Sequence, residues 1–193
     1  MNYLKEKDLL DIEQNVRLFS VDEIEDISHY LFDSKIEEYN EFLNKAKLFS
    51  NLNISKTFLL VHKYTDELIA YMTLSADSIK LTTEEKDMHE IGKVPYASIA
   101  ALKIGKLAVN KGLSDIVKRK GYGSFMLDLA RAYAFEMNKL GIACRFITVD
   151  ADIEYDENTP EFYKKNGFVE NLSNRSRNAS HTISMRKDIF SDD

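Results

Sequence analysis

The chain has 193 residues, 44% of them hydrophobic, and a formal net charge of −6 at pH 7. This length supports one core, so the sequence predicts a single domain over residues 1–193, with a frayed start over residues 1–15. The lone cysteine, Cys144, excludes an intramolecular disulfide and a thiolate zinc set. With neither a secretory leader nor an apolar stretch of the roughly 18 residues that a membrane span needs, a cytoplasmic protein without membrane association is expected.

Acidic side chains are concentrated in the first half of the chain. Residues 1–96 carry 11 basic and 19 acidic side chains, whereas residues 97–193 carry 15 and 13. The negative balance argues against broad, nonspecific attraction to nucleic acid or to an anionic membrane. The less acidic second half suits one small polyanionic ligand, and a local basic patch for RNA stays open.

The first half predicts a strand, a helix and a hairpin. Val16 to Phe19 form a candidate strand. Thr57 to His62 and Leu68 to Ser75 are rich in β-branched and aromatic residues, and the short spacer Thr65 to Glu67 predicts that they pair antiparallel. Between the first strand and this hairpin, apolar residues at helical spacing predict a helix from Ile36 with one face on the sheet: Tyr39, Phe42, Leu43, Ala46 and Phe49.

The middle of the chain predicts a polar connection and then a long central strand. Lys80 to Lys93 is charged and reads as a short helix or excursion, either a solvated connection or a segment that shapes the route of an acceptor. Ile99 to Val109 follows as the strand. Gly105 inside it indicates a bulge or a close backbone approach.

A basic turn with two glycines comes after this strand. It reads Lys118-Arg119-Lys120-Gly121-Tyr122-Gly123-Ser124 and leads into a predicted helix over Phe125 to Leu140, closed by Gly141. The missing β-carbons let amide groups approach a bulky anion, and the helix N-terminus and basic side chains favour a phosphate there. Alternatively, the glycines only let the helix pack closely on its strand.

The last third predicts a strand, a short helix and a final strand. Arg145 to Ala151 is apolar and β-branched, and Thr182 to Arg186 has a similar composition. The helix between them begins with Thr159 as N-cap and Pro160 at its first position, and Gly167 ends it in a left-handed conformation.

Two of these segments together resemble the GNAT family of N-acetyltransferases. The acetyl-CoA turn of that family has the pattern Arg/Gln-x-x-Gly-x-Gly/Ala, matched by Lys118 to Gly123, and its later helix commonly ends in Phe-Tyr-x-x-x-Gly-Phe, matched by Phe162 to Phe168. Upstream, Tyr71 to Ser75 and Ile104 to Val109 look most like the branch that includes tRNA-acetylating toxins.

The sequence departs from the family pattern in two places. Lys118 replaces the preferred Arg or Gln, which keeps charge but loses the planar fork, so a phosphate contact can shift to Arg119. The link Asn110 to Val117 is several residues longer than usual and can reshape the rim of a pocket.

The resemblance implies an α/β (α+β) fold with a mixed, mostly antiparallel central sheet, helices on both faces and a splay at the central strand. It also implies acetyl-CoA as acyl donor, and Tyr163 as the general acid that protonates the leaving thiolate. Tyr163 could instead close the core, and the strand amides could serve only sheet pairing. The implied cofactor-binding residues are Leu107, Ala108, Val109, Lys118, Arg119, Lys120, Gly121, Tyr122, Gly123 and Ser124.

No general base stands out, because each candidate also has a structural explanation: His89, Glu90, Asp150 and Glu161. The other histidines show no ligand spacing, so no metal is predicted.

The predicted function is direct transfer of an acetyl group from acetyl-CoA to a primary amine in a ternary complex. The acidic balance and the longer link favour a small-molecule or protein amine as acceptor. Acetylation of aminoacyl-tRNA, as in a toxin-like enzyme, is the alternative. A non-catalytic acyl-CoA-binding module that regulates a partner is a third hypothesis, and a homodimer is left open.

Overall fold

The computed structural model describes residues 6–172 and 181–191. The chain divides into two compact units, and each is described by itself. The N-terminal unit comprises residues 2–75 and 105–129, and the C-terminal unit comprises residues 76–104 and 130–193. Neither unit is one continuous stretch of chain, and the single domain over residues 1–193 stays a prediction.

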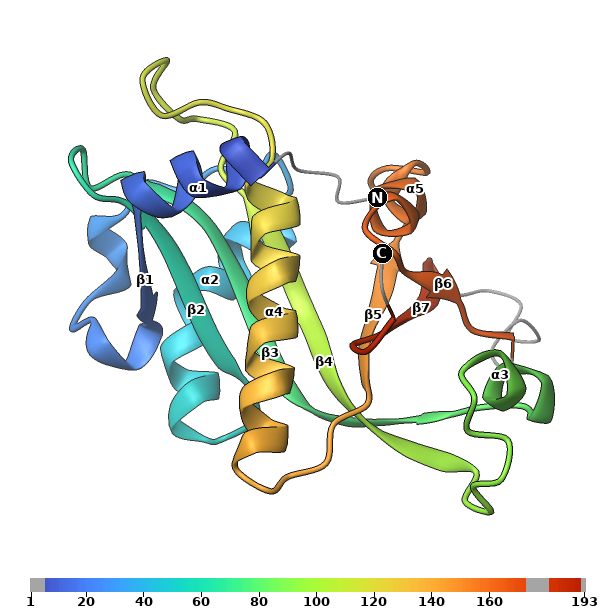
Figure 1. The fold of residues 1–193 in the computed structure, drawn as a ribbon. Coiled ribbons are helices and arrows are strands. Elements are labelled where there is room, and N and C mark those ends of the chain that lie inside the picture. The colour runs from blue at the N-terminus through green and yellow to red at the C-terminus, as the bar shows by residue number, and fades with distance from the viewer. Residues whose placement is uncertain (1–5, 173–180, 192–193) are drawn as a thin grey trace. The chain divides into compact units, whose positions relative to one another are not determined.

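Seven strands form one sheet in the order β1-β2-β3-β4-β5-β7-β6 (Figure 1). Of the pairings described, only β4 with β5 is parallel, which confirms the predicted mixed, mostly antiparallel sheet. The strands are β1 (Val16–Ser20), β2 (Lys56–His62), β3 (Leu68–Lys80), β4 (Ser98–Val109), β5 (Phe146–Asp152), β6 (Val169–Glu170) and β7 (Thr182–Asp188).

The described part of the N-terminal unit begins with a helix, inside the segment 1–15 for which the sequence predicted a frayed start. Helix α1 (Glu6–Asn15) carries Ile12, which is fully buried. Two short 3-10 turns, η1 (Val21–Glu23) and η2 (Ile27–His29), lead toward helix α2 (Glu37–Asn51). Burial of Ile12 stabilises this helix despite its charged sequence.

The predicted hairpin and its covering helix are confirmed in this unit. β2 and β3 pair antiparallel, and Asp66 takes a left-handed conformation, φ 56°, in the connecting turn. Within this unit, α2 lies behind the strands, and the first turns of α4 (Tyr122–Lys139) lie in front of them (Figure 1). The α2 face packs on a buried cluster that includes Val21, Leu43, Ala46, Leu59, Val61, Leu68, Tyr71 and Ala108.

The C-terminal unit contains helices α3 (Thr83–Met88) and α5 (Thr159–Lys165). Its core includes Ile79, Leu81, Ala101 and Phe146. The parallel ladder between β4 and β5 runs from Ala101↔Phe146 to Ile104↔Val149. On its other edge β5 pairs antiparallel with β7 along its whole length, from Phe146↔Asp188 to Asp152↔Thr182. The expected splay at the central strand stays a prediction.

Helix α4 ends as the sequence predicted. Gly141 has φ 82°, and the amides of Gly141 and Ile142 donate to the carbonyls of Asn138 and Met137 at 3.0 and 2.9 Å. Within residues 6–172 and 181–191, no helix is both long enough and apolar enough to cross a bilayer.

Candidate active site

The glycine turn opens directly into α4. Gly121 has φ 103°, a conformation that L residues with a side chain rarely adopt, and its carbonyl accepts the amide of Phe125 at 2.9 Å. Gly121 is therefore the N-cap, and the amides of Tyr122, Gly123 and Ser124 form the first turn, which has no acceptor inside the helix. Together with the positive end of the helix dipole, this geometry suits a phosphate.

The side chains of the turn differ in what they can contact. Lys118 and Lys120 are exposed, whereas the Arg119 guanidinium pairs with the carboxylate of Asp11 on α1. The predicted shift of a phosphate contact to Arg119 would therefore require this ion pair to open or to share its guanidinium. The sequence did not indicate Asp11, because the segment that carries it was expected to fray.

Tyr122 contributes its backbone amide, and not its side chain, to the glycine turn. Its ring is buried, and its hydroxyl donates to the carbonyl of Val117 at 2.7 Å. Burial raises the pKa of this phenol. Ser124 is buried as well. The side chains of Tyr122 and Ser124 thus pack inward, while their amides remain at the helix start.

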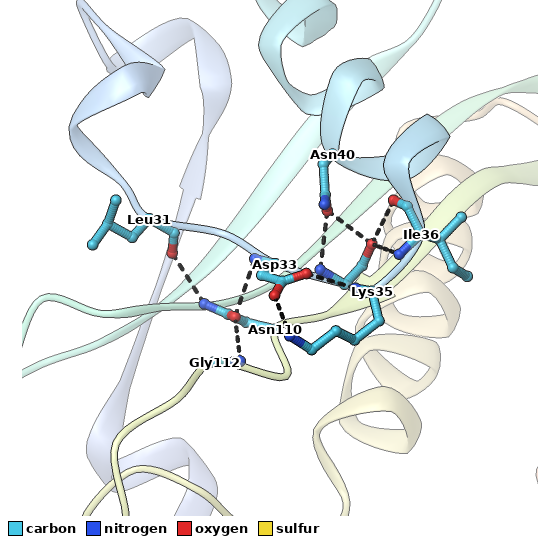
Figure 2. Close-up of polar contacts among 8 residues, drawn as sticks. Leu31, Asp33, Lys35, Ile36, Asn40, Asn110 and Gly112 are labelled. Carbon is cyan, nitrogen blue, oxygen red and sulfur yellow. Dashed lines mark hydrogen bonds and ion pairs between the residues drawn. The ribbon is translucent and has the colours of Figure 1, made fainter.

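Asn110, the first residue of the long link, is a buried hydrogen-bonding hub (Figure 2). Its side-chain amide donates to the carbonyls of Leu31 and Leu68 at 3.0 and 2.8 Å. Its carbonyl oxygen accepts the amides of Asp33 and Gly112 at 3.2 and 2.9 Å. This one side chain uses all four of its hydrogen-bonding positions and ties the approach to α2 to the end of β4.

Replacing Asn110 by alanine is expected to lower the free energy of unfolding by about 2–4 kcal/mol, because it strips partners from four backbone groups in or near the interior. Urea denaturation measures the change. The matched control is Asn51→Ala at the exposed end of α2, which should change the free energy by less than about 0.5 kcal/mol. Equal stability of the two variants would remove the structural role assigned to Asn110.

A second anchor holds the middle of the link. Ser114 donates its amide and its hydroxyl to the two carboxylate oxygens of Glu67, at 2.8 and 2.6 Å. Burial opposes ionisation of Glu67, but the hydrogen bonds from Ser114 outweigh it, so the pKa of this carboxyl lies below its ordinary value. Leu113 and Val117 are buried on either side. The extra length of the link is thus folded against the hairpin.

The end of β4 carries the predicted strand amides. Ala108 is buried in the α2-facing core, whereas Leu107 and Val109 are partly buried. The amide of Lys106 donates to the hydroxyl of Thr73 at 2.8 Å, so a side chain takes the place of a ladder acceptor there. A β-carbon on Gly105 would lie 2.8 Å from the same hydroxyl. The close approach predicted at Gly105 exists, and its partner is a side-chain oxygen.

The turn at the C-terminal end of α5 fixes the position of Tyr163. The amides of Gly167 and Phe168 donate to the carbonyls of Lys164 and Tyr163, both at 3.1 Å, and Gly167 has φ 82° as predicted. This pattern is a Schellman motif, which usually includes an apolar contact between the residues at its two ends. The rings of Tyr163 and Phe168 supply that contact, with centroids 5.4 Å apart.

The start of α5 differs from the prediction by one residue. Asn158 is the N-cap, without a side-chain cap bond, and Thr159 is already helical. The Thr159 hydroxyl donates to the carbonyl of Asp156 at 2.8 Å instead of accepting an amide. The turn centred on Asp156 begins the helix one residue earlier, and Pro160 still lies in its first turn.

The phenol of Tyr163 combines a buried ring with an unused hydroxyl. The residue is 6% exposed, and its hydroxyl makes no hydrogen bond to any other residue within the described ranges. Burial, with a contribution from the charge of Asp152, raises the pKa of this phenol well above its ordinary value. The phenol is therefore protonated at neutral pH, and the raised pKa also makes it a weaker acid.

The candidate general bases already have partners or lie in the open. Asp150 pairs with Lys103 at 2.5 Å, and Glu161 pairs with Lys164 at 2.9 Å on α5. Glu90 is exposed in a left-handed turn, φ 58°. His89 belongs to a polar network. The contacts of these four side chains identify none of them as the general base, so the general base stays unassigned.

The polar segment after β3 is anchored rather than simply solvated. Glu85 on α3 is 0% exposed, and it pairs with Arg186 on β7 at 2.7 Å. The Arg186 Nε donates to Nε2 of His89 at 3.1 Å, which leaves the His89 proton on Nδ1, directed at Asp188 at 3.2 Å. Sequence reasoning missed this pair, although the capping box of Thr82 and Glu85 is visible in the sequence.

Cys144 is a buried thiol, and burial raises its pKa. Among residues 6–172 and 181–191, no group of three or more His, Cys, Asp or Glu side chains could hold a metal ion.

The sheet order, with α4 beginning at Gly121 after β4, belongs to a GNAT-like fold. Among solved structures, the chain is similar to a tyrosine-to-phenylalanine mutant of KacT, with a TM-score of 0.65 and 22% identity over 89% of this chain and 94% of that one. It is also similar to AtaT complexed with acetyl-methionyl-tRNAfMet, with a TM-score of 0.66 and 20% identity over 88% and 94%.

A third similar structure is AtaTR bound with AcCoA, with a TM-score of 0.64 and 18% identity over 91% of this chain and 95% of that one. No protein-family model matches the sequence, and no curated protein matches it. At these identities the likeness establishes the fold, which confirms the structural part of the resemblance.

Proposed function

We propose that this protein is an acetyl-CoA-dependent N-acetyltransferase and that its acceptor is the α-amine of an aminoacyl-tRNA. The observation that carries the acyltransferase part is the helix start at Gly121, where three first-turn amides begin the helix that comes next after β4. These amides would bind the diphosphate of coenzyme A, and the backbone of Leu107, Ala108 and Val109 would bind the pantetheine arm and polarise the thioester carbonyl.

The acceptor is proposed from the structures that share the fold. One of them contains acetyl-methionyl-tRNAfMet and another contains AcCoA. This favours aminoacyl-tRNA over the small-molecule or protein amine that the acidic composition suggested. The basic side chains around the turn, Lys118 and Lys120, are exposed and available for a polyanion despite the net charge of −6.

The proposed reaction is a direct transfer. The lone pair of the neutral amine nitrogen forms a bond to the thioester carbon, the carbon–sulfur bond breaks, and the nitrogen loses one proton to water. The departing thiolate takes the phenolic proton of Tyr163, which regains it from water, so the products are an N-acetyl amide and free coenzyme A.

The test is a thiol-release assay with acetyl-CoA and methionyl-tRNA, run beside spermidine and a lysine peptide. Acetylation of methionyl-tRNA, with an affinity that falls steeply with salt, supports the proposal. Acetylation of spermidine or the peptide alone would move the acceptor to the small or protein amine. Binding of acetyl-CoA in calorimetry without any transfer would favour the regulatory module.

Replacing Tyr163 by phenylalanine is expected to lower kcat by about 10²-fold while the Kd for acetyl-CoA changes little, because the hydroxyl acts on the leaving thiolate and the ring still fills the core. Stopped-flow thiol release and calorimetry separate the two quantities. The control is Tyr122→Phe, which loses a hydroxyl engaged with Val117 and should lower stability rather than kcat. An equal loss of turnover and affinity would make Tyr163 structural.

A further inference from the structure

The start of α2 and the end of β4 meet at an ammonium group within the N-terminal unit. Lys106 Nζ lies 2.5 Å from a carboxylate oxygen of Glu38 and 4.4 Å from the centroid of the Tyr39 ring. The Lys106 side chain is 21% exposed and that of Glu38 is 54% exposed. A carboxylate beside the face of an aromatic ring is a combination that selects organic cations.

This arrangement is fixed from several sides. The hydroxyl of the fully buried Tyr71 donates to the carbonyl of Tyr39 at 2.7 Å. The backbone amide of Lys106 is held by Thr73. Such support is more than an exposed ion pair needs, since surface pairs commonly form without it.

The segment before α2 is fixed as well (Figure 2). Asn40 accepts the amide and the hydroxyl of Ser34 at 3.0 and 2.8 Å. Asn110 holds Asp33 from the end of β4. The first turn of α2, which carries Glu38 and Tyr39, is thereby positioned relative to Lys106 before any ligand arrives.

We propose that Glu38 and Tyr39 recognise the ammonium form of the acceptor amine, and that Lys106 occupies this place until an acceptor displaces it. The inference rests on the proposed function, because Lys106 immediately precedes the three residues assigned there to the thioester arm. An amine captured here would be concentrated beside the acyl group in its protonated form, and would then lose its proton before attack.

The competing explanation is that Lys106 and Glu38 only clamp α2 to β4. The two explanations predict different directions of change in acceptor binding when Lys106 is removed. If the pair is a clamp, removing either partner breaks the same contact and has the same consequence. If the pair is an occupied ammonium site, removing Glu38 takes away the receptor, whereas removing Lys106 takes away a competitor.

The experiment compares Glu38→Gln and Lys106→Met in steady-state kinetics with methionyl-tRNA and with spermidine. Glu38→Gln is expected to raise the acceptor KM about tenfold, and Lys106→Met to lower it a few-fold, while the Kd for acetyl-CoA stays unchanged. The matched control is Glu41→Gln, one turn along α2, which breaks the exposed pair with Lys45 at 3.9 Å and should leave KM as it is.

Shifts of KM in the same direction for both variants, or no shift for either, would overturn the proposal. Spermidine binding by calorimetry without acetyl-CoA gives a second readout, in which Glu38→Gln should weaken binding and Lys106→Met strengthen it. Absence of thiol release with every acceptor would count against the proposed function, whereas unaltered spermidine binding in both variants counts against the ammonium site alone.

Discussion

Replacing Gly123 by arginine is expected to weaken acetyl-CoA binding by about 10³-fold while the protein stays folded. Gly123 is the second residue of α4, partly exposed, and its amide belongs to the first turn. A long side chain there would cover the amides that would otherwise meet the diphosphate. Losing two or three charge-assisted contacts costs on the order of 4 kcal/mol, which corresponds to that factor.

Calorimetry with acetyl-CoA measures this loss, and circular dichroism with thermal unfolding checks the fold. The matched control is Ala132→Arg, which adds the same side chain at an exposed position of the same helix and should leave the Kd unchanged. Tight acetyl-CoA binding by the Gly123 variant would show that the phosphates lie elsewhere.

Replacing Arg186 by methionine is expected to lower the free energy of unfolding by about 3–5 kcal/mol, because it leaves the carboxylate of Glu85 buried without its cation. Glu85 also accepts the amide of Leu172 at 2.8 Å and that of Thr82 at 2.8 Å, so the carboxylate cannot turn toward water without losing both bonds. The comparison variant is Lys164→Met, whose exposed pairs with Glu161 and Glu170 should be worth less than about 1 kcal/mol.

The same pair predicts a pH dependence. Burial opposes ionisation of Glu85, but amide hydrogen bonds and the Arg186 charge outweigh it and hold its pKa below the ordinary value. A lowered native pKa contributes stability above the unfolded pKa, and that stability is lost as the pH falls through the native value. Urea denaturation between pH 7 and 3 should show wild type losing stability on acidification, with a smaller slope in the Arg186 variant. Parallel slopes would contradict this assignment.

The elements that sequence reasoning located best are those whose signal is local. The hairpin at Thr65 to Glu67, the apolar face of α2 and the glycine ends at Gly141 and Gly167 all follow from periodicity and turn chemistry, which act over a few residues. The mixed, mostly antiparallel pairing of the sheet also agreed with the resemblance, because two separate motifs indicated the same fold.

What sequence reasoning missed depends on contacts between distant residues. α1 looked weakly patterned because its order comes from the burial of Ile12, which no local pattern announces. The pair of Glu85 with Arg186 joins residues about a hundred positions apart, so its carboxylate looked like one more solvated charge. The ammonium group of Lys106 likewise contacts α2 only in the folded chain, so no local pattern indicates this contact.

The pairing of Arg119 with Asp11 bears on how the protein can be handled. A chain trimmed at Val16, as the charged beginning of the sequence invites, would uncover the apolar surface beneath Ile12 and free Arg119 from its carboxylate. Shortening this end would therefore alter the glycine turn at Gly121 through α1, and a tag that distorts the helix would act in the same way.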